Sequence, residues 1–134
     1  LASTNITMEG QLQMLNMDNN CLKTIENNAF YSMRIIRLSI VNNYLSELAV
    51  DLLGNMTSII YLDLEYNLIE SISFGFFDAL IVLREIKLDY NLISSLDDFL
   101  FRNLNILQKL SFRSNFISVV TGKTFAGLHS LVYL

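Results

Sequence analysis

Apolar residues recur along this chain at a spacing much longer than the period of a helix or a strand. Asn43, Asn67, Asn91 and Asn115 follow one another at a constant interval, and the interval from Asn20 to Asn43 is shorter by a single position. Around each asparagine, seven equivalent positions are apolar. In the third unit these seven are Ile59, Leu62, Leu64, Ile69, Ile72, Phe77 and Leu80. Self-similarity of this kind predicts a solenoid, in which each unit packs only on its neighbours.

The repeats divide the chain into consecutive units of one domain. We expect a single segment over residues 1–134, with a partial unit at each end and five full units between them. The bounds are 1–11, 12–34, 35–58, 59–82, 83–106, 107–130 and 131–134. Neither end has the polar capping unit that a solenoid needs. We therefore expect an interior segment of a longer protein, with open ends that favour end-to-end self-association.

The alternation within each unit predicts one strand per unit. Leu62 and Leu64 are separated by a single polar residue, which is the period of a half-buried strand. After the strand the chain must turn, and its backbone groups lose their sheet partners. A buried Asn side chain carries both a donor and an acceptor and can satisfy them. We therefore expect a structural ladder, rather than a ligand or metal site, from Asn20, Asn43, Asn67, Asn91 and Asn115.

The outer position of each unit is also apolar and is usually aromatic. It is occupied in turn by Phe30, Leu53, Phe77, Phe101 and Phe125. We expect this column to fill the wider side of each coil, so that the stack curves and leaves the sheet on the concave face. The predicted fold class is an α/β solenoid, a right-handed superhelix that forms a horseshoe segment. Its sheet is parallel and concave, and its convex side is mostly irregular or short-helical.

The frame Ile59-x-x-Leu62-x-Leu64-x-x-Asn67-x-Ile69 matches the leucine-rich repeat signature. With Phe in the outer position, the units resemble the 24-residue class of Toll-like receptor ectodomains and related invertebrate immune or adhesion proteins. The resemblance covers residues 12–130. It implies a binding module of an extracellular or cell-surface protein, with a protein, microbial or matrix ligand on the concave face. A structural matrix or adhesion component and an intracellular scaffold are the alternatives.

Composition and charge narrow the classes of partner. The chain is 52% hydrophobic and 16% charged, which argues against disorder. Its net charge is −4, and it has no basic block, so we expect no nucleic-acid partner. Charged residues interrupt every apolar run before it reaches the roughly eighteen residues of a membrane span. We therefore expect no direct membrane insertion of this segment.

The residue types that carry chemistry are too sparse for a catalytic site. Cys21 and His129 are each the single residue of their type and lie far apart in the sequence. The matched frames hold no Asp-His-Ser arrangement, no phosphate-binding glycine loop and no His/Cys set at metal-ligand spacing. The adjacent Asp97 and Asp98 are expected to be solvated turn residues. The sequence therefore predicts no enzyme, no catalytic residue, no cofactor and no metal.

Two triplets of the form N-x-[ST] fit an extracellular protein. They are Asn5-Ile6-Thr7 and Asn55-Met56-Thr57, and both fall on the loop side of a coil. A glycan on Asn5 or Asn55 would not obstruct a ligand on the sheet. The alternative is that such triplets arise by chance in a chain containing many Asn and Thr residues.

Specificity is expected at the variable positions between the apolar ones, because their side chains point out of the concave sheet. Tyrosine is enriched at binding surfaces and occurs here beside charged residues. The predicted ligand-binding patch consists of Tyr61, Asp63, Glu65, Tyr66, Arg84, Lys87, Asp89, Tyr90, Lys109 and Arg113. The alternative is an ordinary polar sheet face, with the binding site in repeats outside this segment.

The register of the repeats predicts which charged side chains are neighbours on that face. The expected pairs are Asp63 with Lys87, Glu85 with Lys109, and Asp89 with Arg113. Exposed pairs of this kind contribute less than about 1 kcal/mol each. Glu65 beside Asp89 departs from the pattern, because like charges side by side are unfavourable.

Overall fold

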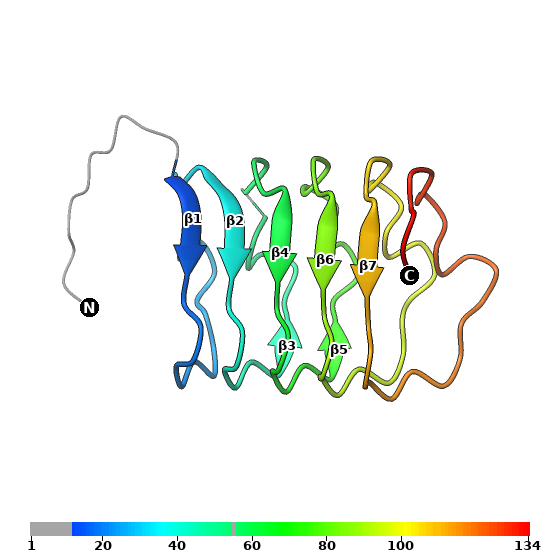
Figure 1. Ribbon diagram of the computed structural model, residues 1–134, viewed down its shortest axis with the longest axis horizontal. Coiled ribbons are helices and arrows are strands. Elements are labelled where there is room, and N and C mark those ends of the chain that lie inside the picture. Colours follow the sequence, from blue (N-terminus) through cyan, green and yellow to red (C-terminus); the bar gives the residue numbers. More distant parts are fainter. Residues whose placement is uncertain (1–11, 55) are drawn as a thin grey trace.

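The computed structural model describes residues 12–54 and 56–134, which form a solenoid of stacked coils (Figure 1). The main sheet has five strands in the order β1-β2-β4-β6-β7, and each strand is parallel to its neighbours. Its strands are β1 (Leu12–Asn16), β2 (Ile35–Ser39), β4 (Tyr61–Asp63), β6 (Glu85–Lys87) and β7 (Lys109–Ser111). An isolated parallel bridge between Lys109 and Tyr133 extends it. The predicted parallel solenoid is confirmed.

The strands pair in the register that the repeat implies. Leu38 lies opposite Leu62, Leu62 opposite Ile86, and Ile86 opposite Leu110. The shorter spacing of the first unit leaves this register unchanged, since Leu15 lies opposite Leu38. A slip by one residue would turn these side chains to the solvent, and the row from Leu38 to Leu110 is instead buried. The expected partial unit over residues 1–11 lies outside the described residues.

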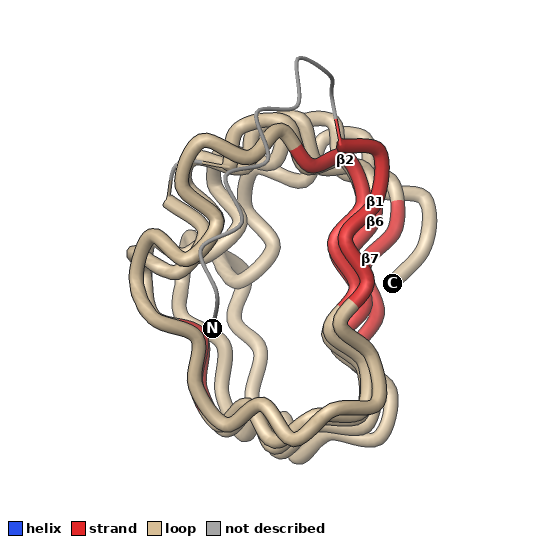
Figure 2. The backbone as a smooth tube through the Cα atoms, turned by 90° about the vertical axis from the view of Figure 1, so that its left-hand side faces the viewer, coloured by secondary structure: helices blue, strands red, loops and turns tan. Residues whose placement is uncertain are grey.

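The rest of each coil is built from turns. The described residues form no helix, and their further strands are β3 (Glu47–Leu48) and β5 (Ser71–Ile72), which pair in parallel. Figure 2 looks along the stack and shows the main sheet on one side, with loops around most of the remaining circuit. The irregular side that the sequence predicts is therefore present, without the short helices that the prediction allowed.

Phenylalanine side chains fill the interior opposite the main sheet. Phe77 and Phe101 are buried, and their ring centroids are 5.4 Å apart. Phe101 also stacks on Phe125 of the next coil, with centroids 6.2 Å apart. Phe76 adds a second ring in the third coil and meets Phe77 edge-on at 4.9 Å. The outer column is thus part of one continuous core that also contains the central leucines.

Asparagine side chains join one coil to the next. The Oδ1 atom of Asn67 accepts a hydrogen bond from the backbone N–H of Leu45 at 3.1 Å. Its Nδ2 atom donates to the carbonyl oxygens of Ile40 at 2.8 Å and Leu64 at 3.2 Å. Equivalent bonds between coils are made by Asn43, Asn91 and Asn115. Asn20 is exposed and donates to carbonyl oxygens of its own turn.

The residue before each ladder asparagine has left-handed backbone geometry, with φ between 54° and 58°. This column consists of Asn19, Asn42, Tyr66, Tyr90 and Ser114. The left-handed conformation turns the chain out of the sheet and brings the following Asn side chain into the interior. Asn adopts this conformation readily, whereas a bulky side chain does so rarely. The two tyrosines therefore lie in a turn beyond the strand ends, a placement that sequence reasoning missed.

Gly127→Ala is expected to destabilise the fold by about 2 kcal/mol. Gly127 has φ +96°, and a Cβ atom there would lie 2.5 Å from the backbone oxygen of Arg102. The free energy of unfolding in urea measures the effect. Gly54→Ala is the control, because its Cβ would have no heavy atom closer than 3.8 Å. Equal losses in the two variants would contradict this account of Gly127.

Candidate binding face

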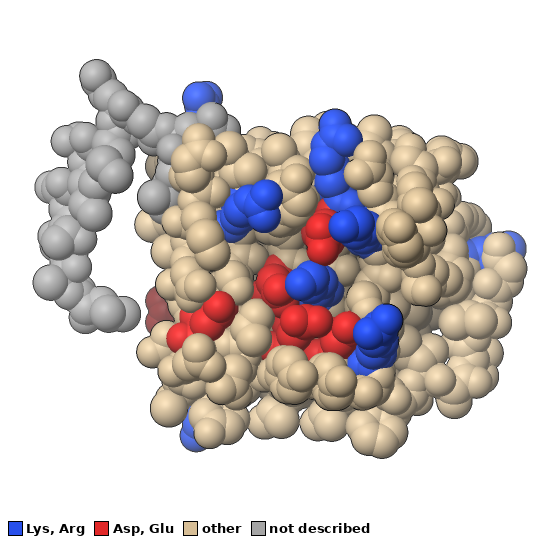
Figure 3. Space-filling model, in the orientation of Figure 1, with Lys and Arg blue, Asp and Glu red and all other residues tan. Residues whose placement is uncertain are grey.

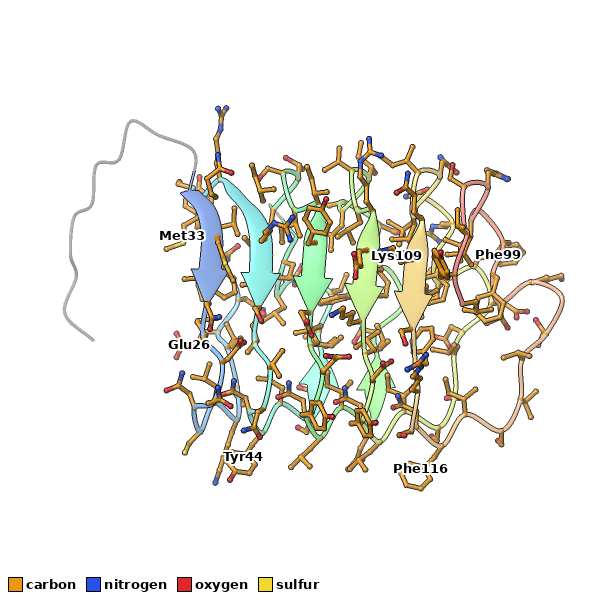
Figure 4. All side chains as sticks on the ribbon, viewed as in Figure 1. Glu26, Met33, Tyr44, Phe99, Lys109 and Phe116 are labelled. Atoms are coloured by element: carbon orange, nitrogen blue, oxygen red, sulfur yellow. The ribbon has the colours of Figure 1, made fainter. Side chains whose placement is uncertain are left out.

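Alternate residues of the main strands project from the sheet on the side away from the core. In β4 and β6 the outer residues are half-buried and the central one is buried. Lys109 of β7 is exposed and is labelled over the sheet, between β6 and β7, in Figure 4. These side chains come from adjacent strands and form one surface. We call this set the sheet face: Arg37, Tyr61, Asp63, Glu85, Lys87 and Lys109.

Two ion pairs connect neighbouring strands across the sheet face. The Nζ atom of Lys87 lies 3.5 Å from Oδ2 of Asp63. The Nζ atom of Lys109 lies 3.8 Å from Oε2 of Glu85. Both lysine side chains are substantially exposed, so each pair adds less than about 1 kcal/mol to stability. The pairs arrange charges on the sheet face and contribute little to the stability of the fold.

An aromatic and cationic contact orders the other half of the sheet face. The guanidinium carbon of Arg37 lies 3.7 Å from the centroid of the Tyr61 ring, within the range of a cation–π interaction. A hollow of about 160 Å³ adjoins this pair and is also lined by Asp63, Glu85 and Lys87. Sequence reasoning placed Tyr61 on this face but did not identify Arg37 as its partner, although the two hold equivalent positions in adjacent repeats and the strand register places them opposite each other.

Asp89 is buried, with 7% of its surface exposed, although its position in the repeat suggested an accessible side chain. Its Oδ1 atom accepts a hydrogen bond from the backbone N–H of Arg113 at 2.8 Å. Asp18 makes the equivalent bond to the N–H of Val41 at 2.7 Å. Within residues 12–54 and 56–134, no ion pair joins Asp89 to Arg113. Instead of the expected contact between the two side chains, the Asp89 carboxylate bonds to the backbone of Arg113, which lies beyond the end of β7.

Tyr66 and Tyr90 stack on each other, with ring centroids 4.4 Å apart and an angle of 7° between the planes. Each is about half exposed. They follow the ends of β4 and β6, and neither lines the hollows over the sheet. The structure therefore places them along the edge of the sheet rather than on its face. Arg84 is exposed immediately before β6, and Arg113 is exposed beyond β7.

The carboxyl groups of Asp63, Glu65 and Asp89 gather near the Asp63–Lys87 ion pair of the sheet face. Burial raises the pKa of Asp63, and for Glu65 both burial and the neighbouring Asp63 and Asp89 raise the pKa. Although partial burial of Lys87 acts against it, the nearby carboxylates of Asp63, Glu65 and Glu85 raise its pKa. Figure 3 shows red carboxylates gathered across the lower part of this surface. No group of His, Cys, Asp and Glu in the described part of the chain could hold a metal ion.

Glu65→Gln is expected to stabilise the protein slightly at pH 7, by less than about 1 kcal/mol. A raised pKa means that the folded protein binds the Glu65 proton more tightly than the unfolded chain does. Wild-type stability should therefore fall as pH rises from the usual Glu value of 4.5 through the higher folded pKa. Thermal unfolding measures both proteins from pH 4 to pH 7. A gain that stayed constant, or grew as pH fell, would contradict the expectation.

A larger hollow of about 570 Å³ continues from the sheet face toward the last coils. Its charged lining residues are Glu65, Glu85, Lys87, Asp89, Lys109 and Arg113. Apolar side chains such as Phe112 line the remainder. Seven of the ten residues predicted for the patch therefore line one or both hollows, whereas Tyr66, Tyr90 and Arg84 do not.

The proposed glycosylation sites Asn5 and Asn55 lie outside the described residues. Among the residues that are described, none belongs to a helix long and apolar enough to cross a membrane.

The coil geometry is shared with leucine-rich repeat domains of known structure. The domain of APL1B superposes with a TM-score of 0.83 at 25% identity, over 90% of this chain and 35% of that one. Toll, in the Drosophila Toll–Spatzle complex, superposes with a TM-score of 0.76 at 22% identity, over 84% of this chain and 17% of that one. TLR13, in the TLR13–ssRNA13 complex, superposes with a TM-score of 0.80 at 22% identity, over 91% of this chain and 22% of that one. The chain thus spans about a third or less of these structures.

No curated protein matches the sequence, but a family model does. The model described as leucine rich repeat matches residues 34–93 and 81–134, which is more than half of the chain. The matched residues include the central row of the main sheet and the buried asparagines that bond one coil to the next. Fold, sequence frame and family model agree. The chain belongs to the leucine-rich repeat family.

Proposed function

We propose that this chain is a recognition module that binds a protein ligand through the sheet face, on the concave side of the stack. The observation that carries the proposal is the ordered contact between Arg37 and Tyr61 at 3.7 Å beside the Asp63–Lys87 ion pair. Tyr and Arg are the residue types most often found at the centres of protein interfaces. Because these side chains are held in place before binding, a ligand loses less conformational entropy on contact.

The similar structures support a binding role and suggest the class of partner. The Toll structure is a complex with Spatzle, and the TLR13 structure is a complex with ssRNA13. A nucleic-acid ligand would favour a basic surface, whereas this chain has a net charge of −4 and mixed charges on its sheet face. A protein, including a microbial or matrix protein, is therefore the better match for this face.

A photo-reactive amino acid at position 61 tests the proposed face. The chain carrying it at Tyr61 is expressed in secreting cells and irradiated, and adducts are identified by mass spectrometry. A second chain carries the same group at Phe74, which is 50% exposed and follows β5 on the opposite side of the coil. We expect discrete protein adducts from position 61 that Arg37→Ala reduces. Equal adducts from both positions, or adducts from position 74 alone, would contradict the proposal.

We also propose an extracellular or cell-surface setting, supported by the two glycosylation triplets at Asn5 and Asn55. Expression in a secreting host should give a chain whose mass falls after treatment with an N-glycosidase. Asn5→Gln combined with Asn55→Gln should remove that difference. A secreted chain without glycan on either residue would favour the intracellular scaffold, while glycan without any ligand adduct at position 61 would favour a matrix component.

A further inference from the structure

Four exposed apolar side chains occupy the same position in consecutive coils, directly after the ladder asparagines. They are Tyr44, Leu68, Leu92 and Phe116, which are 49%, 42%, 37% and 66% exposed. Figure 4 labels Tyr44 and Phe116 along the lower edge of the molecule, where both point away from the sheet. Exposed apolar residues scattered singly are ordinary, but contiguous patches mark interaction sites.

The backbone holds this row in regular spacing. The N–H groups of all four residues donate to carbonyl oxygens of the preceding coil at 2.8–2.9 Å. Successive side chains are therefore about one strand spacing, or roughly 4.8 Å, apart. The stacked rings of Tyr66 and Tyr90 lie two residues before Leu68 and Leu92 and border the same edge. We call the set the edge stripe: Tyr44, Tyr66, Leu68, Tyr90, Leu92 and Phe116.

Folding does not explain the composition of the edge stripe. The next residues along the chain, Leu45, Ile69 and Ile93, are buried and already supply the core at this level. Tyr66 and Tyr90 have left-handed backbone geometry, with φ of 55° and 57°, which bulky side chains rarely adopt. The turn requires this geometry in every coil, but Asn42 and Ser114 supply it elsewhere with small polar side chains. The turn therefore does not explain the choice of tyrosine at these two positions, and a costly residue choice at a strained position is a reason to look for function.

Acidic residues border the edge stripe on both sides. Glu65 lies toward the sheet face, next to the buried Asp89. On the other side of the stripe, Glu47 belongs to β3 and Glu70 directly precedes β5. Glu47 and Glu70 are exposed. The ion pairs of the described residues involve Asp63, Asp78 and Glu85 but none of these four. An apolar row with acidic margins is complementary to a partner that has an apolar ridge with basic margins.

We propose that the edge stripe is a second docking surface, which binds an amphipathic helix whose apolar face is flanked by lysine or arginine. Along such a helix, apolar residues recur about every 5.4 Å, close to the spacing of the coils. One apolar side chain of the helix can thus lie beside each coil. An extended strand fits less well, because alternate residues share a face and are separated by about 6.6 Å. This surface is separate from the sheet face and goes beyond the function proposed above.

The single cysteine allows the binding of such a helix to be measured directly. Cys21 is exposed and follows Asn20, so it holds the position in the first described coil that Tyr44 holds in the next. An environment-sensitive dye on Cys21 is titrated with a synthetic helical peptide of Leu and Lys. We expect saturable binding that weakens with added salt. Tyr44→Ser/Leu68→Ser/Leu92→Ser is expected to weaken it about ten-fold or more, which corresponds to about 1.4 kcal/mol.

A control variant replaces equally exposed apolar residues elsewhere, as Val50→Ser/Phe74→Ser/Ile81→Ser, which are 44%, 50% and 55% exposed in the wild type. It should bind the peptide like the wild type, and a peptide of Leu and Glu should not bind. Glu47→Lys/Glu70→Lys should also weaken binding, and it leaves every apolar residue in place if the serine variant folds poorly. Binding that both sets of variants leave unchanged, equal loss in the control variant, or equal binding of the Leu–Glu peptide would overturn the proposal. Adducts from position 61 should be unaffected by the edge variants, which separates this test from that of the sheet face.

Discussion

Asn91→Ala is expected to lower the free energy of unfolding by about 3–5 kcal/mol. Asn91 is 2% exposed. It accepts a hydrogen bond from the N–H of Ile69 and donates to the carbonyl oxygens of Leu64, Leu88 and Asp89. Removing the side chain leaves these groups without partners in the interior, and each such group costs about 1–3 kcal/mol. Unfolding in urea, followed by circular dichroism, measures the loss.

Asn20→Ala is the matched control for the ladder. Asn20 is exposed, and its Nδ2 atom donates to Met17 and Asp18 within its own turn. Water can replace these bonds, so we expect a loss below about 1 kcal/mol. If both variants lost the same stability, the hydrogen bonds between coils would not be what holds the stack together.

Phe101→Ala is expected to destabilise the protein by about 3–5 kcal/mol, because it leaves a cavity in the middle of the core. The Phe101 side chain is fully buried. Its ring lies 5.4 Å from that of Phe77, 6.1 Å from that of Phe112 and 6.2 Å from that of Phe125, so it connects successive coils. The midpoint and slope of urea unfolding give the change in stability.

Phe99→Ala is the control for the loss of a ring. Phe99 lies two residues away but is 43% exposed, and its ring centroid is 5.7 Å from the Nζ atom of Lys123. We expect a loss below about 1 kcal/mol, since little apolar surface is returned to water. A loss at Phe99 that matched the loss at Phe101 would show that the outer column is not a packed core.

The buried frame could be predicted from the sequence because every unit repeats it. The position of Leu62 fixes that of Ile86 and Leu110, and one Asn column fixes where each strand ends. The pairing of Asp63 with Lys87 follows from the same register. A pattern that recurs in five strands specifies the sheet far more strongly than the local preferences of any one strand could.

Features that depend on backbone direction outside the strands could not be predicted in this way. Asp89 occupies an outward position in the repeat, but the backbone N–H of Arg113 turns its carboxylate inward. Tyr66 and Tyr90 are close in sequence to the sheet face, but left-handed geometry moves them to the edge. The two-residue strands β3 and β5 are too short to leave a periodic signal. For Asp89, Tyr66 and Tyr90, the conformation of the turn determines where the side chain lies, and the pattern of apolar residues contains no information about that conformation.

The residues that stabilise the coils are thus different from those that we propose for recognition. The asparagine ladder, the leucine row and the phenylalanine column stabilise the coils. The sheet face between them carries side chains whose contacts contribute little to stability. This separation lets a solenoid of one architecture present different surfaces in different repeats.

The free energy of unfolding of a sheet-face variant tests that separation most directly. Arg37→Ser/Arg84→Ser/Lys109→Ser removes three exposed cationic side chains from the sheet and its entry edge. We predict that urea unfolding gives a value within about 1 kcal/mol of the unaltered chain, since only exposed contacts are lost. A loss as large as that of Asn91→Ala would contradict the account, because the sheet-face side chains would then be needed for the stability of the fold.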